Sequence, residues 1–189
     1  EWLQVLGPSD ATSNIWGARW SKMVWNSMNN AMAGLMGPHL DRATAAEKEL
    51  AALVNVVIAA EAARVAVRLG VAMEPTQGLR MEDFAAATTR ETILEMKERL
   101  AGARAQRAIT AAQVAHLGVP NRPSLLQDVV KGRRTEVDYL NGKIASLGRE
   151  LGIPTPMNDV LVRVMHELEA GARTPGPHNL EALRPFLGF

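Results

Sequence analysis

Apolar residues recur at helical spacing along most of the chain, and this pattern predicts an all-α fold. The second of the predicted helices is dense in alanine, which permits close approach of neighbouring helices, so we place it at the centre of a helical bundle. No part of the chain alternates in the way that would build a parallel sheet. The predicted long helices cover about residues 11–36, 44–69, 90–116 and 124–151, with a shorter one over 157–170.

Glycine and proline mark the ends of these segments. Gly37-Pro38 ends the first helix, and Gly152 followed by Pro154 ends the fourth. Between the second and third helices the chain is broken by glycine and proline, with a short helical candidate at residues 82–87. Residues 180–187 are predicted to form a last short helix that docks on the bundle or on another subunit.

The stretch from Ser124 to Leu151 has the pattern of one long amphipathic helix. Ser124 and Gln127 predict a capping box at its start. Gly132 costs roughly 1 kcal/mol relative to alanine inside a helix, which is most easily explained if a group must approach the backbone there. The apolar stripe consists of Leu126, Val130, Val137, Leu140, Ile144, Leu147 and Leu151.

Two acids and one polar line interrupt these apolar faces. Glu136 lies at the edge of the stripe, where spacing alone favours an ion pair with a neighbouring arginine over a functional acid. For Glu61, in the second helix, structural pairing is likewise favoured over a role in a pocket. Lys22, Asn26 and Asn30 follow one another at steps of four, so they share one side of the first helix. Because unpaired buried polar groups cost about 1–3 kcal/mol each, this line faces water, a partner or a ligand.

Composition narrows the class of protein. With 189 residues and 47% hydrophobic content, the chain predicts one globular domain over residues 1–189. A net charge of +1 with dispersed basic residues argues against nucleic-acid binding. The absence of cysteine, of a signal peptide and of an uninterrupted apolar run of about 18 residues predicts a cytoplasmic protein without a membrane span. The four histidines have no metal-ligand spacing, so no metal site is predicted.

Two stretches carry a resemblance to a known family. They are WSKMVWNSMNN, from Trp20 to Asn30, and the region from Pro123 to Asn158, which contains PSLLQD, GRRTEVDYLNG and GIPTP. Both resemble the C-terminal domain of ketopantoate reductase (2-dehydropantoate 2-reductase). The resemblance implies a helical bundle of the kind that follows the Rossmann domain in the 6-phosphogluconate dehydrogenase-like superfamily.

The resemblance also implies an activity: the NADPH-dependent reduction of ketopantoate to pantoate in pantothenate and coenzyme A biosynthesis. It assigns Lys22 as the catalytic acid, and Asn26, Asn30 and Ser124 as substrate-binding residues. Glu136 would bind the substrate hydroxyl or the cofactor ribose, and could hold Lys22 in place.

The cofactor half of such an enzyme is missing from this sequence. No two of its 15 glycines are spaced G-x-G, so the dinucleotide fingerprint is absent. NADPH would therefore be bound mainly by a Rossmann domain of the same full-length protein, and the chain by itself is expected to be inactive. Two alternatives stay open: a stand-alone helical dimerisation or ligand-binding module, and a reductase of another 2-oxo acid. Whether the protein forms a homodimer also stays open.

Overall fold

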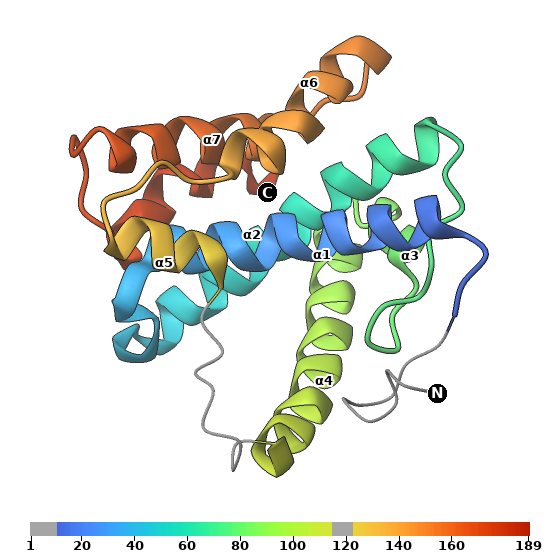
Figure 1. The fold of residues 1–189 in the computed structure, drawn as a ribbon, viewed down its shortest axis with the longest axis horizontal. Coiled ribbons are helices and arrows are strands. Elements are labelled where there is room, and N and C mark those ends of the chain that lie inside the picture. Colours follow the sequence, from blue (N-terminus) through green and yellow to red (C-terminus); the bar gives the residue numbers. More distant parts are fainter. Residues whose placement is uncertain (1–10, 115–122) are drawn as a thin grey trace.

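The structure, a computed structural model, describes residues 11–114 and 123–189 and is helical (Figure 1). The prediction of an all-α bundle is confirmed: within the described residues, β-type pairing is limited to an isolated bridge between Thr76 and Leu79. The α-helices are α1 Ile15–Met36, α2 Ala45–Arg68, α3 Met81–Ala85, α4 Arg90–Val114, α5 Ser124–Val130, α6 Asn141–Leu151 and α7 Pro156–Glu169. Short 3-10 helices are η2 Gly37–Arg42, η4 Val137–Tyr139, η5 Pro177–Ala182 and η6 Arg184–Leu187.

Helix α2 lies at the centre of the bundle, as its alanine content predicts. It begins at Thr44, whose side chain and that of Glu47 form a capping box. It packs against α1, α3, α4, α6 and α7, and the alanines of its second half are fully buried: Ala59, Ala60, Ala62, Ala63 and Ala66. In Figure 1, α1 crosses in front of α2, while α6 and α7 lie on one side of this pair and α4 extends away on the other.

Helix α2 is also long and apolar enough to cross a membrane, and among the described residues it is the one helix that meets this test. Its most apolar window is 78% buried inside the bundle. A core helix meets the same criteria of length and composition, and burial of this extent is what a core helix shows.

The predicted single helix from Ser124 to Leu151 is wrong, because the chain reverses after Val130. Gly132 adopts φ 61°, a left-handed conformation. Its N–H donates to the carbonyl of Val129, and that of Arg133 donates to the carbonyl of Asp128, the two bonds of a Schellman helix end. A β-carbon built on Gly132 would meet nothing within 4 Å, so conformation rather than a close approach requires this glycine.

The predicted apolar stripe fails at its first half for the same reason. Leu125, rather than Leu126, is fully buried, and Val130 is 58% exposed. The second half is a separate helix, α6, in which Ile144 is fully buried as predicted. Gly152 ends α6 in a left-handed conformation, also as predicted.

Most other boundaries follow the sequence closely, although α1 begins at Ile15 rather than near residue 11. Asn14 caps α1 by accepting a hydrogen bond from the amide of Gly17 at 3.0 Å. The short helix α3 forms where residues 82–87 predict it. Helix α4 is described to Val114, so the predicted end of that helix near residue 116 lies outside the described residues.

The segment after α7 docks on the bundle, which is the first of the two alternatives predicted for residues 180–187. It forms η5 and η6 and buries Leu180, Leu183 and Leu187. The amide of Gly176 donates to the carbonyl of Leu35 at 3.0 Å, so this segment also pairs one of the last carbonyls of α1.

Glu61 has a structural role, but its partners are backbone amides rather than an arginine. One carboxylate oxygen accepts from the amide of Met157, and the other accepts from the amide and side chain of Asn158, at 2.7 to 2.9 Å. The acid therefore satisfies the first turn of α7, where the Thr155 side chain makes no capping bond. Burial raises the pKa of Glu61 above its ordinary value, although these hydrogen bonds and nearby Arg64 oppose the shift.

Candidate functional site

The polar line predicted on the first helix lies along the solvent side of α1. Lys22 is exposed, and Asn26 and Asn30 are partly exposed. The opposite side of the same helix is fully buried at Val24, Met28 and Leu35, which fixes the rotation of α1 about its axis. Of these three polar residues, only Asn30 forms a hydrogen bond to another described residue.

Asn30, Ser124 and Glu136 come together in a short hydrogen-bonded chain. The Asn30 side-chain amide donates to the Ser124 hydroxyl at 3.3 Å, and that hydroxyl donates to Oε1 of Glu136 at 2.5 Å. The three residues come from three elements: α1, the first residue of α5 and the residue before η4. We name Lys22, Asn26, Asn30, Ser124 and Glu136 the α1 polar site.

Gly34 allows α5 to approach α1 closely enough for Ser124 to reach Asn30. A β-carbon on Gly34 would lie 3.2 Å from Cβ of Leu125 and 3.0 Å from Cε of Met165. Leu125, the neighbour of Ser124, is fully buried in this contact. The predicted capping box of Ser124 is therefore wrong: Pro123 is the N-cap residue of α5, and the Ser124 hydroxyl points to Glu136 instead.

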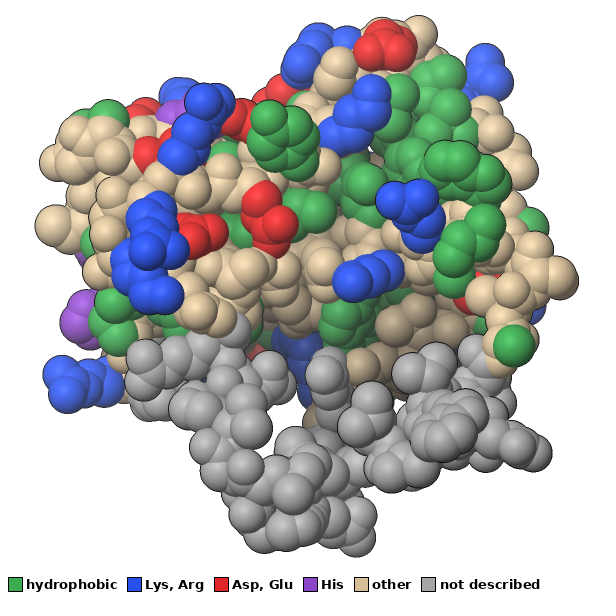
Figure 2. All heavy atoms as spheres, in the orientation of Figure 1, with side chains coloured by type: hydrophobic (Ala, Val, Ile, Leu, Met, Phe, Trp, Pro, Cys, Tyr) green, Lys and Arg blue, Asp and Glu red, His purple; other side chains and the backbone are tan. Residues whose placement is uncertain are grey.

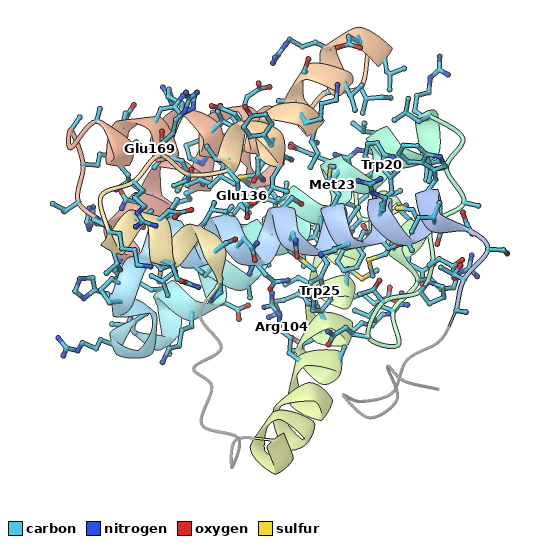
Figure 3. The ribbon with its side chains drawn as sticks, in the orientation of Figure 1. Trp20, Met23, Trp25, Arg104, Glu136 and Glu169 are labelled. Carbon is cyan, nitrogen blue, oxygen red and sulfur yellow. The ribbon has the colours of Figure 1, made fainter. Side chains whose placement is uncertain are left out.

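Glu136 is fixed by its two neighbours. Thr135 is buried, and both its amide and its hydroxyl donate to Glu169 at the end of α7, at 2.7 and 2.6 Å. Val137 is fully buried in the core. The carboxylate between them is partly exposed, and Figure 3 shows it on the side of α1 that faces α6 and α7.

Two contacts were expected for Glu136: an ion pair with a neighbouring arginine, from the spacing, and a contact with Lys22, from the family resemblance. Among the described residues, neither an arginine nor Lys22 lies within ion-pairing distance of it. Arg134 pairs instead with Asp138, at 3.0 Å, and Asp138 also contacts His166 at 2.8 Å. Burial acts to raise the pKa of Asp138, but the hydrogen bonds from Arg134 and His166 outweigh it and lower this pKa below its ordinary value.

The α1 polar site offers the groups that a small polar substrate needs. Lys22 supplies a cationic donor, the two asparagines supply amides, and Ser124 with Glu136 supplies a hydroxyl and a carboxylate. Within the described chain, only Oε1 of Glu136 is hydrogen-bonded, so the second oxygen is available to a hydroxyl of a substrate or of a ribose. Among the described residues, no three or more His, Cys, Asp or Glu side chains cluster so that they could hold a metal ion.

Comparison with known proteins identifies the family of the chain. The family described as ketopantoate reductase PanE/ApbA C terminal matches residues 14–169, which include every residue of the α1 polar site. The 2-dehydropantoate 2-reductase of Archaeoglobus fulgidus is 41% identical over 59 residues, which are 31% of this chain and 20% of that protein. That of Pyrococcus horikoshii is 21% identical over 168 residues, 87% of this chain and 45% of that protein.

A solved structure shows the same fold. It is the ternary structure of D-mandelate dehydrogenase with NADH and anilino(oxo)acetate, with a TM-score of 0.54 and 23% identity over 85% of this chain and 43% of that one. The chain thus spans less than half the length of each of these three proteins. Because the family match covers most of its residues, the chain belongs to the ketopantoate reductase family, as the C-terminal domain.

Proposed function

We propose that this chain forms the catalytic and substrate-binding half of an NADPH-dependent 2-dehydropantoate 2-reductase, which converts ketopantoate to pantoate. The observation that carries the proposal is the Asn30–Ser124–Glu136 hydrogen-bonded chain on the same flank of α1 as Lys22. Family membership supports the reaction class, since the curated relatives are named for this reaction.

Lys22 takes the role of general acid. Reduction of a ketone places negative charge on the carbonyl oxygen, and a positioned ammonium group both stabilises that charge and supplies the proton. The Lys22 side chain is exposed and forms no hydrogen bond or ion pair within the described residues, so its ammonium group is available to a substrate.

Asn26, Asn30 and Ser124 hold the carboxylate and hydroxyl groups of the substrate. Glu136 accepts a hydrogen bond from the substrate hydroxyl or from the cofactor ribose through its second oxygen. A nicotinamide cofactor supplies the hydride when it is bound. This chain would contribute Glu136 to the cofactor site. A Rossmann half of the same full-length protein would bind the remainder of the cofactor, because these 189 residues hold no G-x-G fingerprint.

An exposed apolar surface supports the docking of that second half. Ile15 and Trp16 at the start of α1 are 58% and 66% exposed, and Val67 and Leu69 near the end of α2 are 48% and 40% exposed. The two helix ends are neighbours, because Asn14 donates to the carbonyl of Ala72 at 2.8 Å. Figure 2 shows hydrophobic side chains gathered over this end of the molecule. We assign this surface to the Rossmann half; a homodimer on the same surface would appear as a dimer of the 189-residue chain in sedimentation.

The test is Lys22→Ala in the two-domain protein. We expect the kcat for ketopantoate reduction to fall by about 10²- to 10⁴-fold, the usual contribution of a general acid. Lys143→Ala removes an exposed lysine from α6 and should leave kcat within about twofold, as expected for a surface change. Circular dichroism establishes that both variants are folded. An unchanged kcat in a folded Lys22→Ala enzyme would contradict the assignment of Lys22 as the general acid. A two-domain protein without measurable ketopantoate reduction would favour the stand-alone binding module.

A second candidate substrate is another 2-oxo acid, because one solved structure with this fold is a D-mandelate dehydrogenase with NADH and anilino(oxo)acetate. Comparison of kcat/KM for ketopantoate and benzoylformate, each with NADPH and NADH, separates the two. A site that hydrogen-bonds a substrate hydroxyl rejects an analogue without it by about 10⁴-fold. A preference for benzoylformate would replace ketopantoate as the substrate while keeping the reductase class.

A further inference from the structure

A cavity lies between α1, α2, α4 and the start of α5. Its volume is about 510 Å³, which falls in the range of small-molecule sites. Its lining includes the apolar side chains of Met32, Ala52 and Pro123 and the polar side chains of Asn29, Lys48 and Arg104. In Figure 3, Arg104 and Glu136 lie on opposite sides of α1. None of the residues that line the cavity belongs to the α1 polar site.

Arg104 is the partly buried cation of this cavity. Its Nη2 donates to Oδ1 of Asn29 at 2.6 Å. Asn55, with its amide oriented so that both atoms are paired, donates to the carbonyl of Met28 at 2.7 Å and accepts from the same Nη2 at 3.3 Å. Two amides from α1 and α2 therefore fix one end of the guanidinium group.

The charge of Arg104 is not balanced by the residues that hold it. Both partners are neutral amides, and within the described part of the chain no carboxylate lies within ion-pairing distance. Burial lowers the pKa of Arg104 below its ordinary value, with no nearby acid to oppose the shift. A guanidinium group has five N–H donors, and the two bonds to these amides both leave from Nη2.

The structural explanation is that Arg104 joins α4 to the α1–α2 pair. A neutral hydrogen-bonding side chain would do that without the cost of removing a charge from water. Arg104 is a cation held by two neutral amides, with N–H donors left over, and Lys48 also lines the cavity. This arrangement matches the chemistry that recognises an anion.

We propose that this cavity binds a small organic anion, with its carboxylate or phosphate head on Arg104 and an apolar body against Met32, Ala52 and Pro123. The small side chains of Ala33, Ala51 and Ala52 in the lining leave room for a ring or a short branched chain. This cavity is separate from the α1 polar site, and the proposal does not depend on the proposed reductase function.

The site is tested by titrating the 189-residue chain with benzoate and with phenyl phosphate. Binding is measured by isothermal titration calorimetry or by amide chemical shifts. Inorganic phosphate and benzyl alcohol are the matched probes for the head and the apolar body. We expect at least one aromatic anion to saturate the chain with a Kd near or below about 1 mM, which corresponds to about 4 kcal/mol. Benzyl alcohol, which lacks the charge, should not saturate it. Inorganic phosphate that bound as tightly as phenyl phosphate would overturn the apolar half of the proposal.

Two variants locate the binding. Arg104→Gln removes the charge, and Ala52→Phe fills the cavity without touching the guanidinium group. Each should weaken binding at least about tenfold, or 1.4 kcal/mol. Arg99→Gln, an equal charge change on α4 outside this cavity, and Lys22→Ala, in the α1 polar site, should leave Kd within about twofold. If Arg104→Gln does not fold, Ala52→Phe decides. Unchanged affinity in a folded Ala52→Phe chain, or no saturation by either aromatic anion up to about 20 mM, overturns the proposal.

Discussion

At the scale of single residues, the backbone of Gly132 decides where the proposed catalytic groups lie. Its left-handed conformation turns the chain back after α5, and this reversal lets Ser124, at the start of α5, meet Glu136, twelve residues later. A continuous helix over the same residues would place the two about 18 Å apart along its axis, at 1.5 Å per residue. The hydrogen bond between them therefore depends on one glycine.

Gly132→Ala tests this directly, because the two conformations predict opposite signs. In the left-handed conformation alanine should lower the free energy of unfolding by about 1 kcal/mol. Inside a helix the same change would raise it by about as much. Gly102→Ala is the matched control, since Gly102 lies inside α4 with open space around it and should gain stability. Urea denaturation measures both, and a more stable Gly132→Ala chain would contradict the observed turn.

At the scale of elements, Glu61 connects the central helix to the start of α7. Its carboxylate accepts three hydrogen bonds from Met157 and Asn158. Asn158 also accepts from Asn141 at 2.9 Å, and Asn141 donates to the carbonyl of Ser27 at 3.1 Å. Buried polar groups thus link α2, α7, α6 and α1 through the interior, and this network sets the position of α6 and α7 over α1.

Glu61→Ala should lower the free energy of unfolding by about 2–4 kcal/mol, because two buried backbone amides lose their acceptor. Glu98→Ala, at an acid that is 74% exposed on α4, should change it by less than about 0.5 kcal/mol. Urea denaturation of the 189-residue chain compares the two. Equal losses in both variants would show that the buried acid has no special role.

The raised pKa of Glu61 also predicts a dependence of stability on pH. The folded chain keeps a proton that the unfolded chain releases near the ordinary value of 4.5. Stability from this group is therefore fully present below about pH 4.5 and is lost as the pH rises through the higher folded pKa. The difference in free energy of unfolding between the wild type and Glu61→Ala should shrink over that interval. A difference that stayed constant from about pH 4.5 to 8 would contradict the shift.

At the scale of the whole molecule, the core extends beyond the residues that define the family match. That match ends at residue 169, yet Leu180 and Leu183 are fully buried and Leu187 is 7% exposed. The segment that carries them packs on α2 and α7 and supplies the partner for the carbonyl of Leu35. The folded unit therefore includes η5 and η6.

Removal of residues 172–189 should unfold the chain or leave it with an exposed core. Each leucine contributes about 1.5–3 kcal/mol by burial, and a domain of ordinary stability has only about 5–15 kcal/mol in total. Removal of the last two residues alone takes away Phe189, which is 52% exposed, and should have little effect. Thermal unfolding and dye binding distinguish the two truncations; a cooperative transition at the wild-type temperature in the longer truncation would contradict the role of this segment.

The features that the sequence predicts correctly are those with local causes. The helix ends at Gly37 and Gly152 and the polar line from Lys22 to Asn30 all depend on neighbours within one or two turns. The sequence pattern does not predict the break at Gly132, because apolar residues on both sides of it continue at helical spacing. The pattern therefore predicts one continuous helix with a destabilising glycine inside it.

Partners that are distant in the sequence have no local signal at all. Glu61 and its amide partners are 96 and 97 residues apart, and Asp138 and His166 are 28 apart. Spacing therefore identified the acid but not what it binds. The family resemblance named Asn30, Ser124 and Glu136 together because it carries this tertiary information from other members of the family.

The two bonds of the Asn30–Ser124–Glu136 chain close loops of very different length. Ser124 and Glu136 are 12 residues apart, whereas Asn30 and Ser124 are 94 apart. In polymer terms the longer closure costs about 2 kcal/mol more chain entropy, since the cost rises by about 0.6 kcal/mol with each doubling of length. The serine–carboxylate pair is thus held by its own short segment, while the asparagine joins it only when α5 docks on Gly34. Any change that loosens this docking should open the site at Asn30 first and leave the other pair in place.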